Sequence, residues 1–159
     1  MYEEELKKLF EKALCGEYTS ILVYVKMAAE ISGFNASLVA KELNEHAEKE
    51  LEHARELNEY ANNHGFQIDA CADLGTVNQD YSDLDKTVSK TQELEQDAID
   101  DYHNIFLLAQ EHNDPETMQF AKHIMEEEME HFDDLAKFTG QARELLAASP
   151  KRETAAIPL

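Results

Sequence analysis

The same spacing of glutamate and histidine occurs twice in this sequence. In each half of the chain a lone glutamate is followed 33 residues later by a second glutamate, and a histidine comes three positions after that. The residues are Glu17, Glu50 and His53 in the first half, and Glu95, Glu128 and His131 in the second. A tyrosine also lies seven residues after each lone glutamate, at Tyr24 and Tyr102. The repeat predicts two units of the same design, related by a pseudo-two-fold axis.

Apolar residues recur at helical spacing around these motifs and predict four long helices. The patterns run from Leu6 to Ile31, from Val39 to Ala61, from Leu84 to Ala109 and from Pro115 to Phe138. Asn35 and Asp114 are candidate N-caps, and Gly33, Gly65 and Gly140 follow the ends of three patterns. Glycine and proline are scarce in the chain, with five and three copies, so the sequence predicts an all-α fold.

The connection between the second and third helices, residues 65–83, is longer than most loops in compact domains. A segment of this length reaches about 60 Å when extended, whereas a helix of about 28 residues is about 42 Å long. The connection can therefore cross the whole bundle. This predicts a four-helix bundle with one long crossover, in which the second and third helices are parallel.

The C-terminal segment is expected to lie outside the four-helix bundle of residues 1–140. Residues 141–148 have the pattern of one short helix, and the periodicity stops at Ser149 and Pro150. The remaining residues are interpreted either as a flexible terminus or as a peptide that docks on a partner. Residues 141–159 are therefore predicted to be a short fifth helix followed by a flexible tail.

The repeated glutamates and histidines fall in line with the apolar residues of their helices, so they face the interior of the predicted bundle. A buried carboxylate without a partner takes up a proton or binds a cation. Four ionised glutamates would balance two divalent metal ions, and two neutral imidazoles would complete the ligand set. A solvated acidic face would explain one Glu-x-x-His motif, but the repetition favours a two-metal site with Glu50 and Glu128 as bridging ligands.

The charge of the chain also favours cations as partners. Thirty-four acidic residues against fourteen basic ones give a net charge of −20, which disfavours nucleic acid and anionic membranes. No run of about 18 apolar residues predicts a membrane span. Cys15 and Cys71 form no Cys-x-x-Cys pair and suggest no disulfide framework, so we expect free thiols in a cytoplasmic protein.

Several motifs give the sequence a family resemblance over about residues 3–140. ELEHA and EEMEH contain the two Glu-x-x-His pairs, CGEYTSILVYV contains the first lone glutamate, and LEQDAI contains the second. These motifs resemble those of the ferritin-like di-iron proteins, and of bacterioferritin most closely. The resemblance implies a ferroxidase that binds two iron ions per subunit at Glu17, Glu50, His53, Glu95, Glu128 and His131. It further implies oxidation of Fe(II) by O2 or H2O2 and storage of ferric mineral in a homo-oligomeric cage of 12 or 24 subunits.

Four further residues are assigned from this resemblance or their position. Tyr24 is either a hydrogen-bond or electron donor to the centre or a core tyrosine. Leu51 stands where haem-binding bacterioferritins have methionine, so no haem is predicted. Cys71 matches one cysteine of a redox pair in a Dps-like branch, but Asp97 replaces the other, so no redox pair is expected. His46 either binds or relays an additional metal or is a half-buried, hydrogen-bonded histidine.

Two other functions remain open on the sequence alone. The first is a di-iron oxidoreductase that stores no iron, such as a rubrerythrin-like peroxidase or an oxygenase. The second is a bundle that holds metal without turnover. The number of irons retained per chain and the size of the particle would separate these functions from storage.

Overall fold

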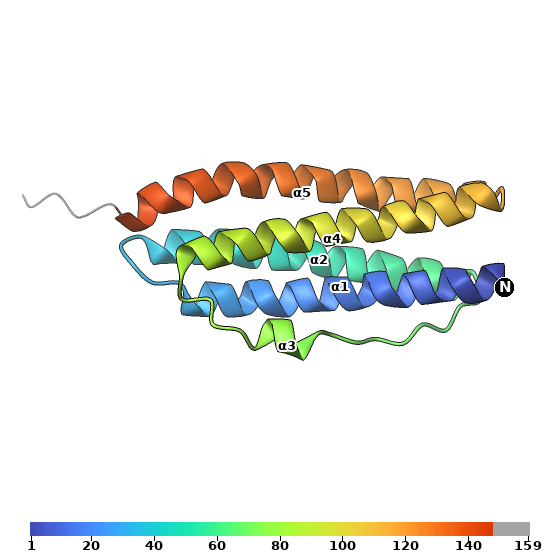
Figure 1. Ribbon diagram of the computed structural model, residues 1–159, viewed down its shortest axis with the longest axis horizontal. Helices are drawn as coiled ribbons and strands as arrows, with labels where there is room; N and C mark the ends of the chain where they lie inside the picture. The colour runs from blue at the N-terminus through green and yellow to red at the C-terminus, as the bar shows by residue number, and fades with distance from the viewer. Residues whose placement is uncertain (148–159) are drawn as a thin grey trace, which may run out of the picture.

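The computed structural model describes residues 1–147 and contains four long helices and one short one (Figure 1). The long helices are α1 (Tyr2–Glu30), α2 (Ala36–Asn63), α4 (Leu84–Glu111) and α5 (Pro115–Ala147), and the short one is α3 (Leu74–Val77). The all-α prediction is confirmed. The long helices form two hairpins, α1 with α2 and α4 with α5, that pack into one bundle.

The connection between α2 and α4 is the predicted crossover. It leaves one end of the bundle after α2 and runs back along α1 to the other end, where α4 begins (Figure 1). Helices α2 and α4 therefore point in the same direction. The short helix α3 lies within this connection and was not expected. The side chain of Asp73 caps it by accepting a hydrogen bond from the backbone N–H of Thr76.

The helix ends follow from local chemistry. Asn35 has a φ of 63°, a left-handed conformation that asparagine tolerates, and it directly precedes α2. Asp83 accepts a hydrogen bond from the N–H of Lys86 and caps α4. Asp114 caps the N–H of Thr117 at 3.1 Å, and Pro115 is the first residue of α5, as predicted.

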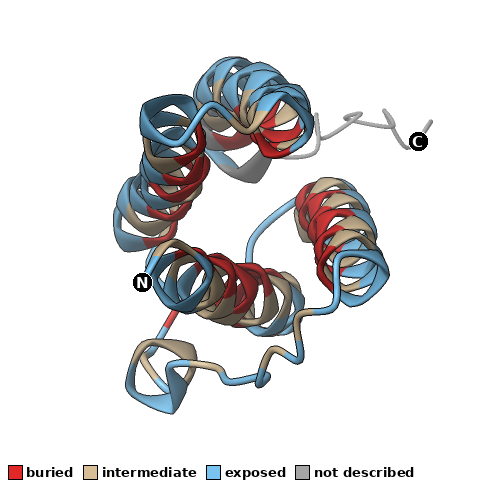
Figure 2. Cartoon of the chain, turned by 90° about the vertical axis from the view of Figure 1, so that its right-hand side faces the viewer, coloured by how far each residue is buried: buried red, intermediate tan, exposed pale blue. Residues whose placement is uncertain are grey.

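The core consists of two apolar clusters separated along the bundle axis. Figure 2 shows that the buried faces of the four long helices turn towards one another. One cluster includes Phe10, Leu57 and Ile105, and the other includes Met27 and Leu43. On every long helix the predicted metal ligands lie between the segments that enter these two clusters. The fold therefore places a polar layer between two apolar ones.

Two sequence-based expectations need correction, and the first concerns α5. This helix continues through Gly140 to Ala147, so residues 141–147 extend the fourth long helix and form no separate fifth one. A glycine inside a helix costs about 1 kcal/mol relative to alanine. Burial of Ala142 in the second apolar cluster offsets this cost. The tail expected from residue 149 lies outside the described residues.

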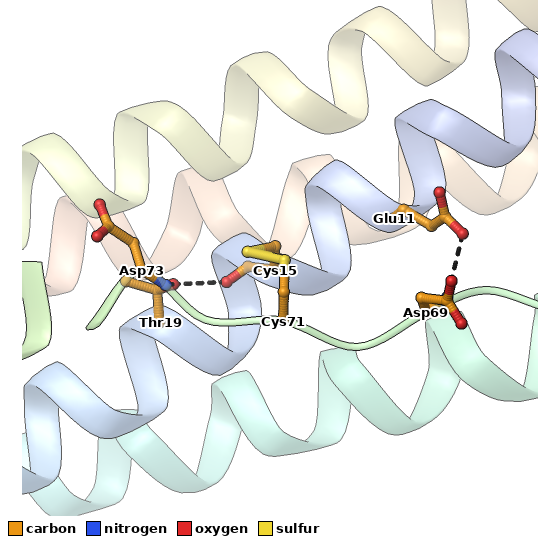
Figure 3. The surroundings of a disulfide bond; sticks show 6 residues. All are labelled: Glu11, Cys15, Thr19, Asp69, Cys71 and Asp73. Carbon is orange, nitrogen blue, oxygen red and sulfur yellow. Dashed lines mark hydrogen bonds between the residues drawn. A yellow bond between two sulfur atoms is a disulfide. The ribbon is translucent and has the colours of Figure 1, made fainter. Parts of the chain in front are cut away.

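The second correction concerns the cysteines, which are joined by a disulfide bond (Figure 3). Cys71 lies in the crossover and Cys15 in α1, and their Cα atoms are 4.7 Å apart. The expectation of two free thiols was wrong. The cysteines therefore no longer support the expected cytoplasmic location, because stable disulfides are typical of oxidising compartments. None of the helices within residues 1–147 is long and apolar enough to cross a membrane.

Candidate metal centre

All six residues of the repeated motif are buried in the polar layer of the bundle. Their exposed fractions are 2% for Glu17, 1% for Glu50, 2% for His53, 2% for Glu95, 0% for Glu128 and 8% for His131. Every long helix contributes to this set: α1 and α4 each provide one glutamate, and α2 and α5 each provide a Glu-x-x-His pair. The i, i+3 spacing puts the Glu and His of each pair on one inward face of its helix. The structure thus brings together side chains from both halves of the chain.

The two Glu-x-x-His motifs meet at the centre of the layer. Glu50, His53, Glu128 and His131 each offer a ligand atom, and these atoms all lie within 4.8 Å of one another. His53 Nδ1 is 2.8 Å from Glu128 Oε1, and His131 Nδ1 is 3.3 Å from Glu128 Oε2. His131 Nδ1 is also 3.5 Å from Glu50 Oε1. Both imidazoles therefore direct Nδ1 at the two glutamates predicted to bridge the metals.

The lone glutamates flank this group and are held by tyrosines. The hydroxyl of Tyr102 in α4 donates a hydrogen bond of 2.7 Å to Glu17 Oε1 in α1. The hydroxyl of Tyr24 in α1 donates in the same way to Glu95 Oε1 in α4. Glu95 Oε2 also lies 3.9 Å from His131 Nδ1. Each tyrosine thus orients the lone glutamate of the opposite hairpin.

Tyr24 was a candidate from the sequence, whereas Tyr102 had been given no role. The signal that identifies Tyr102 was nonetheless present, because both tyrosines follow a lone glutamate by the same spacing. That spacing left open which glutamate each hydroxyl would reach, since the partners lie on different helices.

Several buried atoms of the centre have no hydrogen-bond partner among the described residues. These atoms are Glu17 Oε2, Glu50 Oε1, Glu95 Oε2, Glu128 Oε2 and His131 Nδ1. Buried polar atoms without partners are costly and rare in folded proteins. One free oxygen on each of four converging carboxylates, together with an imidazole nitrogen, is the donor set that divalent transition metals bind. The residues present therefore fit a metal cluster.

Burial and mutual repulsion disfavour negative charge on the lone glutamates. Burial, followed by repulsion from Glu128 and Glu50, raises the pKa of Glu17 well above its ordinary value. Burial, followed by repulsion from Glu50 and Glu128, does the same to the pKa of Glu95. Without a cation these two carboxyl groups favour their protonated forms.

The histidines respond in the opposite direction. Burial alone would lower the pKa of each imidazole, but the adjacent carboxylates of Glu128 and Glu50 outweigh it. These close contacts raise the pKa of His53 to about 12 and that of His131 to about 9. Burial likewise opposes ionisation of Glu50, yet its close contacts with His131 and His53 lower its pKa to about 2. In the absence of metal, imidazolium–carboxylate pairs therefore neutralise the centre.

His46 lies beside the centre without belonging to the group of four ligand atoms. It is 3% exposed, its Nδ1 has no hydrogen-bond partner among the described residues, and its ring centroid is 5.9 Å from that of His131. Burial lowers its pKa to about 4, and the nearby Lys49 acts in the same direction. The histidine is thus neutral and more deeply buried than the hydrogen-bonded residue considered from the sequence.

Glu127 is a neighbour of the centre that the sequence did not single out. Its Oε2 lies 3.2 Å from His53 Nε2, on the opposite side of the ring from Glu128. Glu127 also joins Glu56 and His123 in an outer group of potential ligands. His123 Nε2 is 3.5 Å from Glu56 Oε2 and 3.7 Å from Glu127 Oε2, and all three side chains are at least 41% exposed.

Comparisons with known proteins agree with this architecture. The family model described as "Ferritin-like domain" matches residues 7–145. A structure of ferritin-like, diiron-carboxylate proteins from Bacillus anthracis str. Ames has a TM-score of 0.78 at 21% identity, covering 87% of this chain and 98% of that one.

Two further structures show the same fold at low identity. The bacterioferritin of Desulfovibrio desulfuricans, whose structure concerns its diiron site, has a TM-score of 0.78 at 16% identity, with 92% of this chain and 84% of that chain covered. A PmFTN variant soaked in iron has a TM-score of 0.74 at 20% identity, covering 88% and 89%. No curated protein matches the sequence.

Proposed function

Because the chain belongs to the ferritin-like domain family, we propose that it is an iron-storage ferroxidase. In this proposal Fe(II) binds at the buried centre, is oxidised to Fe(III) by O2 or H2O2, and is stored as ferric mineral inside a homo-oligomeric cage of 12 or 24 subunits. Two irons per subunit would be held by Glu17, Glu50, His53, Glu95, Glu128 and His131. Tyr24 would act as a hydrogen-bond donor to Glu95.

One observation supports this proposal above the others. Four carboxylates and two imidazoles from four helices converge in one buried layer, and each carboxylate has an oxygen without a hydrogen-bond partner among the described residues. Two divalent ions would cancel the charge of four carboxylates. Imidazole and carboxylate ligands suit iron, and the centre would bind two iron ions side by side.

The paired arrangement matches the electron count of the reaction. Two Fe(II) ions lose one electron each, and the two electrons reduce one O2 with two protons to H2O2, or one H2O2 with two protons to two waters. Burial excludes bulk water from this step and strengthens the interaction of the carboxylates with the more highly charged Fe(III). The proposal includes no haem, because Leu51 occupies the position of the haem-ligand methionine.

Iron loading tests the proposal directly. Purified protein is given many equivalents of Fe(II) in air, and the retained iron per chain is measured together with the mass of the particle. A cage-sized particle that retains far more than two irons per chain is the expected result. A monomer or dimer that retains only two would overturn storage and leave a non-storing di-iron oxidoreductase.

A further inference from the structure

His53 is held from both sides by two consecutive glutamates of α5. Glu128 lies 2.8 Å from Nδ1, on the side of the centre, and Glu127 lies 3.2 Å from Nε2, on the outer side. His53 itself is 2% exposed, whereas the side chain of Glu127 is 41% exposed. Glu127 is thus positioned to act on the centre through the imidazole without reaching the metal position.

An ionised carboxylate can only accept a hydrogen bond, so Glu127 requires the proton of His53 to sit on Nε2. A neutral imidazole then has its lone pair on Nδ1, which is the nitrogen that faces the predicted bridging glutamates. A carboxylate behind a metal-bound histidine also fixes the orientation of the ring and raises the basicity of the ligand. Each of these effects strengthens metal binding at His53.

The other half of the centre lacks this arrangement. Glu127 directly precedes Glu128, whereas the residue that directly precedes Glu50 is Lys49, which has no acceptor. Both histidines line one cavity of about 240 Å³ between α2 and α5, together with Glu127 and Lys49. Among the described residues, the ion pairs of His131 all involve Nδ1, and no carboxylate pairs with its Nε2. The pseudo-two-fold symmetry therefore does not extend to the Nε2 atoms of the histidines: Glu127 contacts that of His53, and no carboxylate among the described residues contacts that of His131.

We propose that Glu127 is a positioning residue for His53 and that it makes the His53 half of the centre bind its metal first and more tightly than the His131 half. This inference rests on the two-metal centre of the proposed function, but not on iron oxidation or storage. The ion beside His131 is then the one that exchanges more readily.

The inference is tested with Co(II), which reports its coordination through visible absorption and needs no oxidation step. Wild-type protein is expected to bind Co(II) in two resolved steps. In Glu127→Gln the first step should weaken by about 10- to 100-fold, the usual effect of losing a partner of a metal-bound histidine, while the second stays unchanged. Glu126→Gln is the control, because it removes the same charge from an exposed position of the same helix.

Three further measurements separate an effect on the orientation of the His53 ring from a general effect on the structure. Crystals with one Co(II) per chain should show anomalous scattering beside His53 in the wild type and at both positions in Glu127→Gln. Lys49→Glu, which adds a carboxylate at the equivalent position behind His131, should strengthen the second step. Without metal, Glu127→Gln and Lys49→Glu should have the same melting temperature as Glu126→Gln.

Three outcomes would overturn the inference. The first is equal affinity of both steps in the wild type, and the second is unchanged affinities in Glu127→Gln. The third is that Glu127→Gln loses only a weakly bound ion at Glu56 and His123, while both Co(II)-binding steps of the buried centre keep their affinities. Failure of the wild type itself to bind two Co(II) ions would overturn the two-metal centre as well, whereas a protein that binds them in order but stores no iron would refute storage alone.

Discussion

The imidazoles of His53 and His131 are the groups at which protons and metal ions compete. Their pKa values of about 12 and about 9 keep both rings protonated at neutral pH in the metal-free protein. Burial and repulsion from neighbouring carboxylates raise the pKa values of Glu17 and Glu95 and so disfavour their charged forms. A metal ion must displace these protons before it can bind.

Binding of two divalent ions at neutral pH is therefore expected to release at least about two protons, one from each imidazole. Since the raised histidine pKa values favour the protonated ring, the apparent affinity for Co(II) should fall as the pH falls and rise as the pH approaches about 9. Calorimetric titrations in buffers with different ionisation enthalpies measure the proton count. A binding enthalpy that is the same in all buffers would contradict this prediction.

Tyr102 gives a second prediction at the scale of single residues. Tyr102→Phe removes the hydrogen bond to Glu17 without changing the ring, so the affinity for Co(II) should fall by about tenfold or more. Tyr60→Phe is the matched control, because its hydroxyl bonds to Thr117 within the apolar cluster beside the centre. Equal affinities of the two variants would show that Tyr102 does not orient the ligand.

At the scale of elements, the crossover is fastened to α1 by one face of that helix. Glu11 and Thr19 accept hydrogen bonds from the backbone N–H groups of Asp69 and Asp73, at 3.1 and 2.8 Å. These residues lie on either side of the disulfide (Figure 3). The three anchoring positions of α1 are four residues apart and so share a face. Glu17 lies two residues after Cys15, on the opposite face, which separates the fastening from the metal centre.

Reduction of the disulfide should lower stability without emptying the centre. A bond that closes a loop with a sequence separation of 56 is expected to contribute about 4 kcal/mol by limiting the unfolded chain. Urea unfolding with and without a reductant measures the difference, and the double variant Cys15→Ser/Cys71→Ser should not respond to the reductant. Loss of Co(II) binding on reduction would refute the separation of crossover and centre.

The continuous α5 gives a test of helix stability. Among the described residues, no atom lies within 4 Å of a Cβ added at Gly140, so Gly140→Ala should increase the free energy of unfolding by about 0.5 to 1 kcal/mol. Gly65→Ala should instead destabilise the protein, because Gly65 has a φ of 80°. Chemical unfolding of both variants checks the pair. Destabilisation by Gly140→Ala would indicate that the helix does not continue through this residue.

At the scale of the whole molecule, the fold encloses a layer of titratable side chains between two apolar clusters. Neither cluster can spread across this layer, since the side chains between them are carboxylates and imidazoles. A metal ion that binds only the folded chain shifts the equilibrium towards the folded state. Metal occupancy is therefore expected to contribute to the stability of the entire bundle.

Co(II) at about 100 times its dissociation constant should stabilise the protein by about 2.7 kcal/mol, a rise in melting temperature of about 5 to 10 °C. A chelator should reverse the rise. His53→Ala should abolish most of it, whereas His103→Ala, an exposed histidine of α4, should leave it intact. An equal rise in both variants would point to metal bound elsewhere on the acidic surface.

The sequence by itself determined the four long helices, the long crossover and the six buried residues that converge in the polar layer. These follow from helical periodicity and from the chemistry of single residues, both of which are local properties of a chain. Packing decided the rest: the Cys15–Cys71 bond, the hydrogen bond between Tyr102 and Glu17, and the contact of Glu127 with His53. Each joins side chains of different elements, whose separation depends on how the elements pack, and no spacing along the sequence specifies it.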